Sequence, residues 1–211
     1  MAFPRSLSEG YRRYRRDHCV EDRGRFEQLA SLGQAPTALV IACCDARVQP
    51  QTIFDAEPGE LFVIRNVANL VPPFEESGRY HGTSAAIEYA VLHLKVPHVI
   101  VLGHSHCGGI AAYRENRHKD AAENGFISEW MSILDAAEEL PETAEAGADD
   151  QRKMEIAGIR LSLANLRSFR PLSERAAEGC LSLHGAHYDI ATGTLSVLDE
   201  TGNRLVAVGE A

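Results

Sequence analysis

The sequence predicts an α/β fold with a mostly parallel central sheet, flanking helices, an N-terminal helical arm and a late antiparallel hairpin. Residues 38–42 and 98–102 are short, continuous apolar runs, which are typical of strands covered on both faces. A helix-like segment over residues 83–94 precedes the second run. A further strand near residues 181–188 is followed by a hairpin with its turn near residues 201–203.

The other elements follow from the same periodicity. The expected helices are 8–19, 22–31, 83–94 and 151–169, the second ending at Gly33, and the expected strands are 38–43, 61–66, 98–103 and 181–188. Residues 115–150 are polar, acidic and rich in alanine, which indicates surface helices and loops, with only 126–134 clearly amphipathic. No repeat or linker divides the chain, so we expect one domain over 1–211, with 1–33 as the helical arm and 34–211 as the α/β core.

Composition limits the possible functions. A chain of 211 residues with 45% hydrophobic content can bury a sizeable core, and its net charge of -9 argues against a nucleic-acid partner. No apolar run approaches the length of a membrane span, and the N-terminus lacks the apolar core of a signal peptide. Five cysteines, an odd number, suit a reducing compartment, so we expect a cytoplasmic protein without a membrane partner.

Two cysteine-containing motifs follow the buried strands. One is CCDAR at residues 43–47 and the other is HSHCGG at residues 104–109. The carboxyl ends of neighbouring parallel strands are where ligands bind in an open sheet. Alternation along extended backbone lets Cys43, Asp45 and Arg47 share one side, and His104 and Cys107 can close on the same ion.

Two thiolates and an imidazole form the soft ligand set that suits zinc. Three protein ligands indicate a catalytic site, because structural zinc is normally held by four, and the fourth position would take Asp45 or water. Buried core cysteines and a loop histidine are the alternative, which the joint occurrence at strand ends disfavours. Arg47 would hold Asp45 by a charge-assisted hydrogen bond, and the alternative of an ordinary ion pair is disfavoured by the position of the two residues beside the ligands.

These motifs resemble the β-class carbonic anhydrases, in particular the plant-like branch as it occurs in bacteria. The resemblance runs from Gln34 to Ile110 and returns at residues 183–189. It is carried by CxDxR at 43–47, RNVAN at 65–69, AIEYAV at 86–91, GHxxCGG at 103–109 and LHGxxYD at 183–189.

The resemblance implies one Zn²⁺ per chain and reversible hydration of carbon dioxide, by zinc-bound hydroxide, to bicarbonate and a proton. It implies a homodimer or tetramer in which a glutamine binds substrate across the dimer interface. The implied metal ligands are Cys43, His104 and Cys107, the catalytic dyad is Asp45 and Arg47, and the implied substrate-binding residues are Gln34, Phe62, Val67, Tyr89 and the Gly108 backbone.

Other functions remain open. Zinc-dependent hydrolysis of carbon disulfide or carbonyl sulfide would use the same metal site, whereas the dyad and the acidic charge disfavour a zinc-storing or nucleic-acid-binding module. Cys44 and Ala46 replace serines usual in the family, and Cys44 either fills space or adds an oxidation liability.

One regulatory property is expected to be missing. Some bacterial members bind an inhibitory bicarbonate beside a tryptophan, and Val40 occupies that position here, although the matching Arg65 and Tyr188 are present. We therefore expect an incomplete pocket, with water rather than Asp45 on the zinc.

Overall fold

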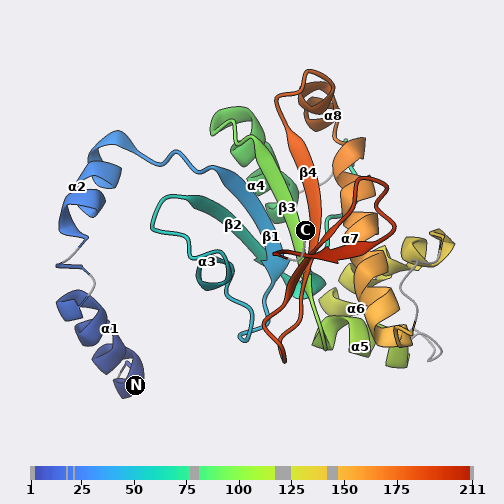
Figure 1. The fold of residues 1–211 in the computed structure, drawn as a ribbon, viewed down its shortest axis with the longest axis horizontal. Coiled ribbons are helices and arrows are strands. Elements are labelled where there is room, and N and C mark those ends of the chain that lie inside the picture. Colours follow the sequence, from blue (N-terminus) through green and yellow to red (C-terminus); the bar gives the residue numbers. More distant parts are fainter. Residues whose placement is uncertain are drawn as a thin grey trace.

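A six-stranded sheet in the order β2-β1-β3-β4-β5-β6 forms the centre of the protein (Figure 1). The computed structural model describes residues 3–17, 19–20, 22–76, 81–116, 125–141 and 147–209. The strands are β1 (Ala38–Cys43), β2 (Leu61–Asn66), β3 (His98–His104), β4 (Ser182–Tyr188), β5 (Leu195–Leu198) and β6 (Leu205–Ala207). The first four are mutually parallel, and β5 and β6 extend the sheet as an antiparallel hairpin, so the predicted fold class is confirmed.

Strand β1 shows why the apolar runs form buried strands. All six of its residues are buried, and successive side chains enter cores on opposite faces of the sheet. Leu39 and Ile41 belong to the core that includes Ile159, whereas Val40 and Ala42 pack with Val48 on the other face. An uninterrupted apolar run is therefore the pattern that this position in the sheet requires.

Helices pack on the sheet and connect its strands, apart from the first two, which form the N-terminal arm (Figure 1). They are α1 (Arg5–Asp17), α2 (Arg23–Leu32), α3 (Pro50–Ile53), α4 (Gly82–Glu88), α5 (Gly108–Asn116), α6 (Phe126–Met131), α7 (Asp150–Ser168) and α8 (Arg170–Ala177), with short helical segments η1 (Val67–Asn69), η2 (Tyr89–His93) and η3 (Ser132–Glu139). The predicted 83–94 helix is thus α4 continued by a π-helical turn, η2. A single π-helical turn is too short for its different hydrogen-bonding pattern to be recognised from the sequence.

Helix α7 lies close to β3 and β4 because glycines leave room for it. A β-carbon on Gly103 would lie 2.7 Å from Ile159 Cδ1, and one on Gly185 would lie 2.8 Å from Ile159 Cγ2. Larger residues at these two positions would push the helix away from the sheet. This close approach brings polar side chains of α7 to the edge of the sheet where β3 ends.

The N-terminal arm projects away from the sheet (Figure 1). Neither α1 nor α2 contains a buried residue, and Leu7, Tyr11 and Leu32 are 59%, 58% and 78% exposed. Helix α1 begins at Arg5, earlier than the predicted residue 8. The arm therefore presents apolar surface that this chain alone does not cover.

The segment predicted as surface helices and loops is partly buried. Met131 and Leu134 are 5% and 0% exposed, because α6 and η3 contribute to a core that also contains Cys43 and Cys107. Residues 117–124 and 142–146 of that segment lie outside the described residues. Within the described ranges, no helix combines the length and apolar character that a membrane crossing needs.

Candidate metal centre

Three potential metal ligands meet at the carboxyl ends of β1 and β3. Cys43 ends β1, His104 ends β3, and Cys107 lies in the turn before α5. Their ligating atoms all lie within 4.8 Å of one another, and all three residues are buried. Parallel pairing of β1 with β3 brings the two motifs together across 64 residues, as the sequence predicts.

The geometry of this cluster fits a zinc ion. The Sγ atoms of Cys43 and Cys107 are 4.0 Å apart, and two thiolates bound tetrahedrally at about 2.3 Å would be about 3.8 Å apart. His104 Nδ1 lies 2.9 Å from the Ser105 carbonyl oxygen, which requires a proton on Nδ1. His104 Nε2 is buried, and none of the residues that the structure describes offers it a hydrogen-bond partner. An orphaned lone pair beside two thiols is the arrangement that a zinc ion would satisfy.

The two thiols interact strongly even without a metal. The hydrogen bond from Cys107 lowers the pKa of Cys43 to about 4 and raises the pKa of Cys107 above its ordinary value. Burial alone would lower the pKa of His104, but its interactions with the Cys43 thiolate and Ser105 raise it. Cys43 is therefore the more readily ionised of the two thiols.

Asp45 and Arg47 form a bidentate pair beside the cluster. Arg47 Nε donates to Asp45 Oδ1 at 2.9 Å, and Nη2 donates to Oδ2 at 2.7 Å. Arg47 Nη2 also donates to the His106 carbonyl at 3.1 Å, so the pair is tied to the Cys107 turn. These hydrogen bonds hold the pKa of Asp45 far below its usual range. The carboxylate is thus ionised and directed to arginine.

Arg65 fixes the backbone that carries this pair. Its Nε donates to the Cys43 carbonyl at 2.9 Å, and its Nη2 donates to the carbonyls of Asp45 and Val48 at 2.7 Å. The sequence points to Arg65 only as part of a family motif, whereas the structure shows what its side chain holds. The side chain of Val40, which stands where some family members have tryptophan, is fully buried and has no hydrogen-bond donor.

Val67, Gly108 and Gly109 lie at the same end of the sheet. Val67 packs against the core that contains Cys43 and Cys107. A β-carbon on Gly109 would lie 2.8 Å from Val67 Cγ1, whereas a β-carbon on Gly108 would meet no described atom within 4 Å beyond the adjoining residues and the backbone of its own helix. Apolar surface and open space therefore adjoin the three candidate metal ligands.

Phe62, Tyr89 and Gln34 lie elsewhere in the chain. The rings of Phe62 and Tyr89 are 5.9 Å apart, so these two residues pack together. Phe62 pairs with Leu39, four residues before the Cys43–Asn66 pair, which is about 13 Å along the strand. Gln34 is exposed between α2 and β1. A single chain does not bring these three side chains to the metal ligands.

Sequence reasoning missed a buried polar group behind Cys107. Glu155 and His187 are 4% and 1% exposed, and His187 Nε2 donates to Glu155 Oε2 at 3.1 Å. Burial would raise the pKa of Glu155, but hydrogen bonds from His187 and the Cys107 amide lower it. A carboxylate within the apolar stripe of the 151–169 helix is the only sequence signal for this group.

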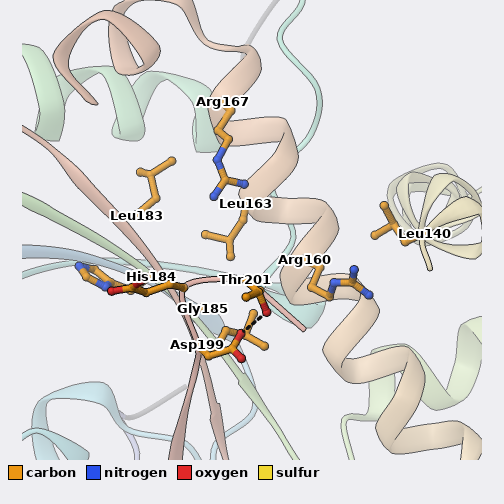
Figure 2. Close-up of a pocket in the computed structure, with 12 residues that line it drawn as sticks. Leu140, Arg160, Leu163, Arg167, Leu183, His184, Gly185, Asp199 and Thr201 are labelled. Atoms are coloured by element: carbon orange, nitrogen blue, oxygen red, sulfur yellow. Dashed lines mark hydrogen bonds between the residues drawn. The ribbon is translucent and has the colours of Figure 1, made fainter. Parts of the chain in front are cut away.

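A cavity of about 440 Å³ lies apart from these ligands, between α7 and the β4–β5 part of the sheet (Figure 2). Arg160, Arg167, His184 and Asp199 are among the residues that line it, and the lining includes none of the predicted site residues. Asp199 is directed toward Thr201, which donates a hydrogen bond to it at 2.8 Å (Figure 2). This cavity is therefore separate from the Cys43, His104 and Cys107 cluster.

Comparisons with known proteins agree with this geometry. The family model for carbonic anhydrase matches residues 38–195. A carbonic anhydrase of Pseudomonas aeruginosa is 36% identical over 208 residues, which cover 98% of this chain and 92% of the relative. The structure of the β-carbonic anhydrase CcaA has a TM-score of 0.79 at 33% identity, over 96% of this chain and 98% of that one.

A second solved structure, described among tetrameric β-carbonic anhydrases of the filamentous ascomycete Sordaria macrospora, has a TM-score of 0.69. It is 31% identical, over 97% of this chain and 94% of that chain. The family match spans the strands that carry both cysteine motifs. On this sequence and structural similarity, the chain belongs to the carbonic anhydrase family and is an enzyme of the β class.

Proposed function

We propose that this carbonic anhydrase catalyses the reversible hydration of carbon dioxide to bicarbonate and a proton, with one zinc ion per chain. Cys43, His104 and Cys107 would hold the ion. The observation that carries the proposal is the convergence of their donor atoms within 4.8 Å, including a buried imidazole nitrogen that has no hydrogen-bond partner in the described part of the chain. The membership of the β class supports the reaction.

The chemistry that zinc supplies in such a site is activation of water, whose pKa falls from about 15.7 to about 7. That lowered pKa is known for the zinc-bound water of carbonic anhydrase itself. With three protein ligands, the site leaves one position open for water.

The dyad orients the reacting groups. Arg47 occupies both carboxylate oxygens of Asp45, which keeps the carboxylate from the ligand cluster and leaves its remaining lone pairs to accept a hydrogen bond. The site thereby gains a fixed acceptor without losing the open ligand position.

The substrate side of the site is apolar and small. Val67 offers an apolar wall, and the absence of a side chain at Gly108 leaves space beside Cys107. Carbon dioxide is itself small and apolar, so a dry hollow is sufficient to bind it. We assign Val67 and the Gly108 backbone to that hollow.

Gln34, Phe62 and Tyr89 would complete the pocket from a second copy of the chain. Their distance from the metal ligands within one chain and the exposure of the N-terminal arm both support a homodimer, or a tetramer built from dimers. The tetrameric state given for the Sordaria macrospora relatives is consistent with this assembly. A cytoplasmic location is also proposed, supported by five cysteines that are all free.

The test combines metal analysis with a stopped-flow carbon dioxide hydration assay. The wild-type protein should contain about one zinc per chain and be active, whereas His104→Ala and Cys107→Ala should lose both zinc and activity. Cys44→Ala is the matched control, because Cys44 is exposed and adjoins the ligand Cys43. Full zinc and full activity in the ligand variants would contradict the proposal. Turnover of carbonyl sulfide or carbon disulfide without carbon dioxide hydration would instead favour the hydrolase.

A further inference from the structure

The backbone of Cys107 is held by two side chains of α7. Its N–H donates to Glu155 Oε1 at 3.1 Å, and its carbonyl accepts from Gln151 Nε2 at 3.1 Å. Gln151 Nε2 also donates to Glu155 Oε1 at 2.9 Å. The two side chains are neighbours because residues four apart lie on the same face of a helix. Both polar groups of the Cys107 backbone are thus bound to one helix.

A third side chain secures Glu155 from the sheet. His187 on β4 donates to the second carboxylate oxygen, and the side chains of His187 and Glu155 are 1% and 2% exposed. A buried carboxylate is unfavourable unless its oxygens are hydrogen-bonded, and here both of them are. The carboxylate is therefore fixed between the helix, the sheet and the Cys107 turn.

The turn that these residues hold has an unfavourable backbone conformation. His106 has φ of 55°, in the left-handed region that non-glycine residues seldom adopt. Its carbonyl accepts from Arg47 Nη2, and the N–H of the same peptide unit donates to Glu155. A strained turn persists only when its surroundings fix it, and this peptide is fixed at both ends.

We infer that Glu155 is a positioning residue of the metal centre, which with Gln151 and His187 holds the Cys107 backbone so that its Sγ faces Cys43 and His104. The inference rests on the proposed zinc site, and it adds residues that act on the backbone of one ligand rather than on the ion. A role in packing alone would not require that both the amide and the carbonyl of one metal ligand bind α7.

The test measures zinc release from the holoenzyme to an excess of chelator. Glu155→Ala should release zinc about 10 to 100 times faster than wild type, as is typical when a group that supports a ligand is removed. Ser162→Ala is the matched control, since Ser162 lies on α7 with 0% exposure and accepts from the Val71 amide at 3.1 Å. This control should lower the thermal midpoint and leave the zinc release rate near that of wild type.

A conservative variant separates hydrogen bonding from packing. Glu155→Gln retains an oxygen that can accept the Cys107 N–H, so its release rate should fall between those of wild type and Glu155→Ala. Gln151→Ala should also accelerate release, and these two variants carry the test if Glu155→Ala does not fold. The thiolate charge-transfer band of the cobalt-substituted protein should shift in Glu155→Ala and stay unchanged in Ser162→Ala.

Two results would overturn the inference. One is release within about twofold of wild type from Glu155→Ala or, if that variant does not fold, from both Glu155→Gln and Gln151→Ala. The other is equal acceleration by Ser162→Ala and the Glu155 variant. Wild-type protein that binds no zinc would contradict the proposed function, whereas a full complement of zinc with unchanged release contradicts only the role of Glu155.

Discussion

Replacing Arg47 by alanine should slow carbon dioxide hydration, because the carboxylate of Asp45 would lose its guanidinium partner. Arg47 makes three hydrogen bonds to this carboxylate, two from the side chain and one from its backbone N–H at 2.9 Å. Only the backbone bond survives the substitution. The freed carboxylate could then rotate toward the metal and compete with water for the open position.

The expected loss is about 10 to 100-fold in the hydration rate per bound zinc, the usual effect of removing a group that orients a metal site. The Arg47 side chain is 52% exposed, so we expect little change in folding stability. Removing the arginine lets the pKa of Asp45 rise toward its ordinary value of about 3.9. Since the carboxylate stays ionised well above that pH, the rate loss should be similar at neutral and mildly alkaline pH.

Stopped-flow hydration with parallel zinc analysis would test this reasoning. Arg170→Ala is a matched control, because Arg170 forms an exposed ion pair with Glu174 on α8, away from the metal ligands. Asp45→Asn should cost less in the Arg47→Ala background than in wild type, since the two residues act as a unit. An unchanged hydration rate in Arg47→Ala, or strictly additive losses in the double variant, would refute the argument.

Metal-free protein at about pH 6 should show the ultraviolet absorbance of one thiolate per chain, because the pKa of Cys43 is about 4 and a thiol with a lowered pKa is ionised above it. Cys43→Ser should abolish this signal, and its persistence would be contrary evidence. Leu7 and Tyr11 are exposed apolar residues of the N-terminal arm, so the double variant Leu7→Glu, Tyr11→Glu should be a monomer by light scattering and should hydrate carbon dioxide more slowly. A monomer with full activity would disprove the role of the dimer. Added bicarbonate should not inhibit the enzyme cooperatively, because Val40 has no side-chain donor to bind it. A neutral-pH structure with Asp45 bound to the metal would count against this prediction.

The sequence alone predicted the buried strands and the donor residues of the candidate metal site. The apolar runs that became β1 and β3 are continuous because both strands lie inside the sheet, and such runs can be recognised locally. Cys43 and His104 end these strands, so a parallel arrangement is enough to bring them together. Soft donor atoms in that position predict zinc before any distance is known.

The placement of Phe62 and the form of the helix over residues 83–94 were decided by strand register and packing. Phe62 is separated from the metal ligands because of its pairing with Leu39, and this pairing is a relation between two strands. The apolar pattern of residues 83–94 predicts a helix, but over one turn it is too short to reveal the i→i+5 hydrogen bonding with which the segment ends.

The contact between Glu155 and the Cys107 amide depended entirely on tertiary structure. It joins residues 48 apart, and it forms because Gly103 and Gly185 allow α7 to lie close to the sheet. A sequence pattern reports which faces are apolar and which donor atoms follow a strand. It does not report the depth and angle at which a helix packs, because these are set by the combined shape of side chains from distant parts of the chain.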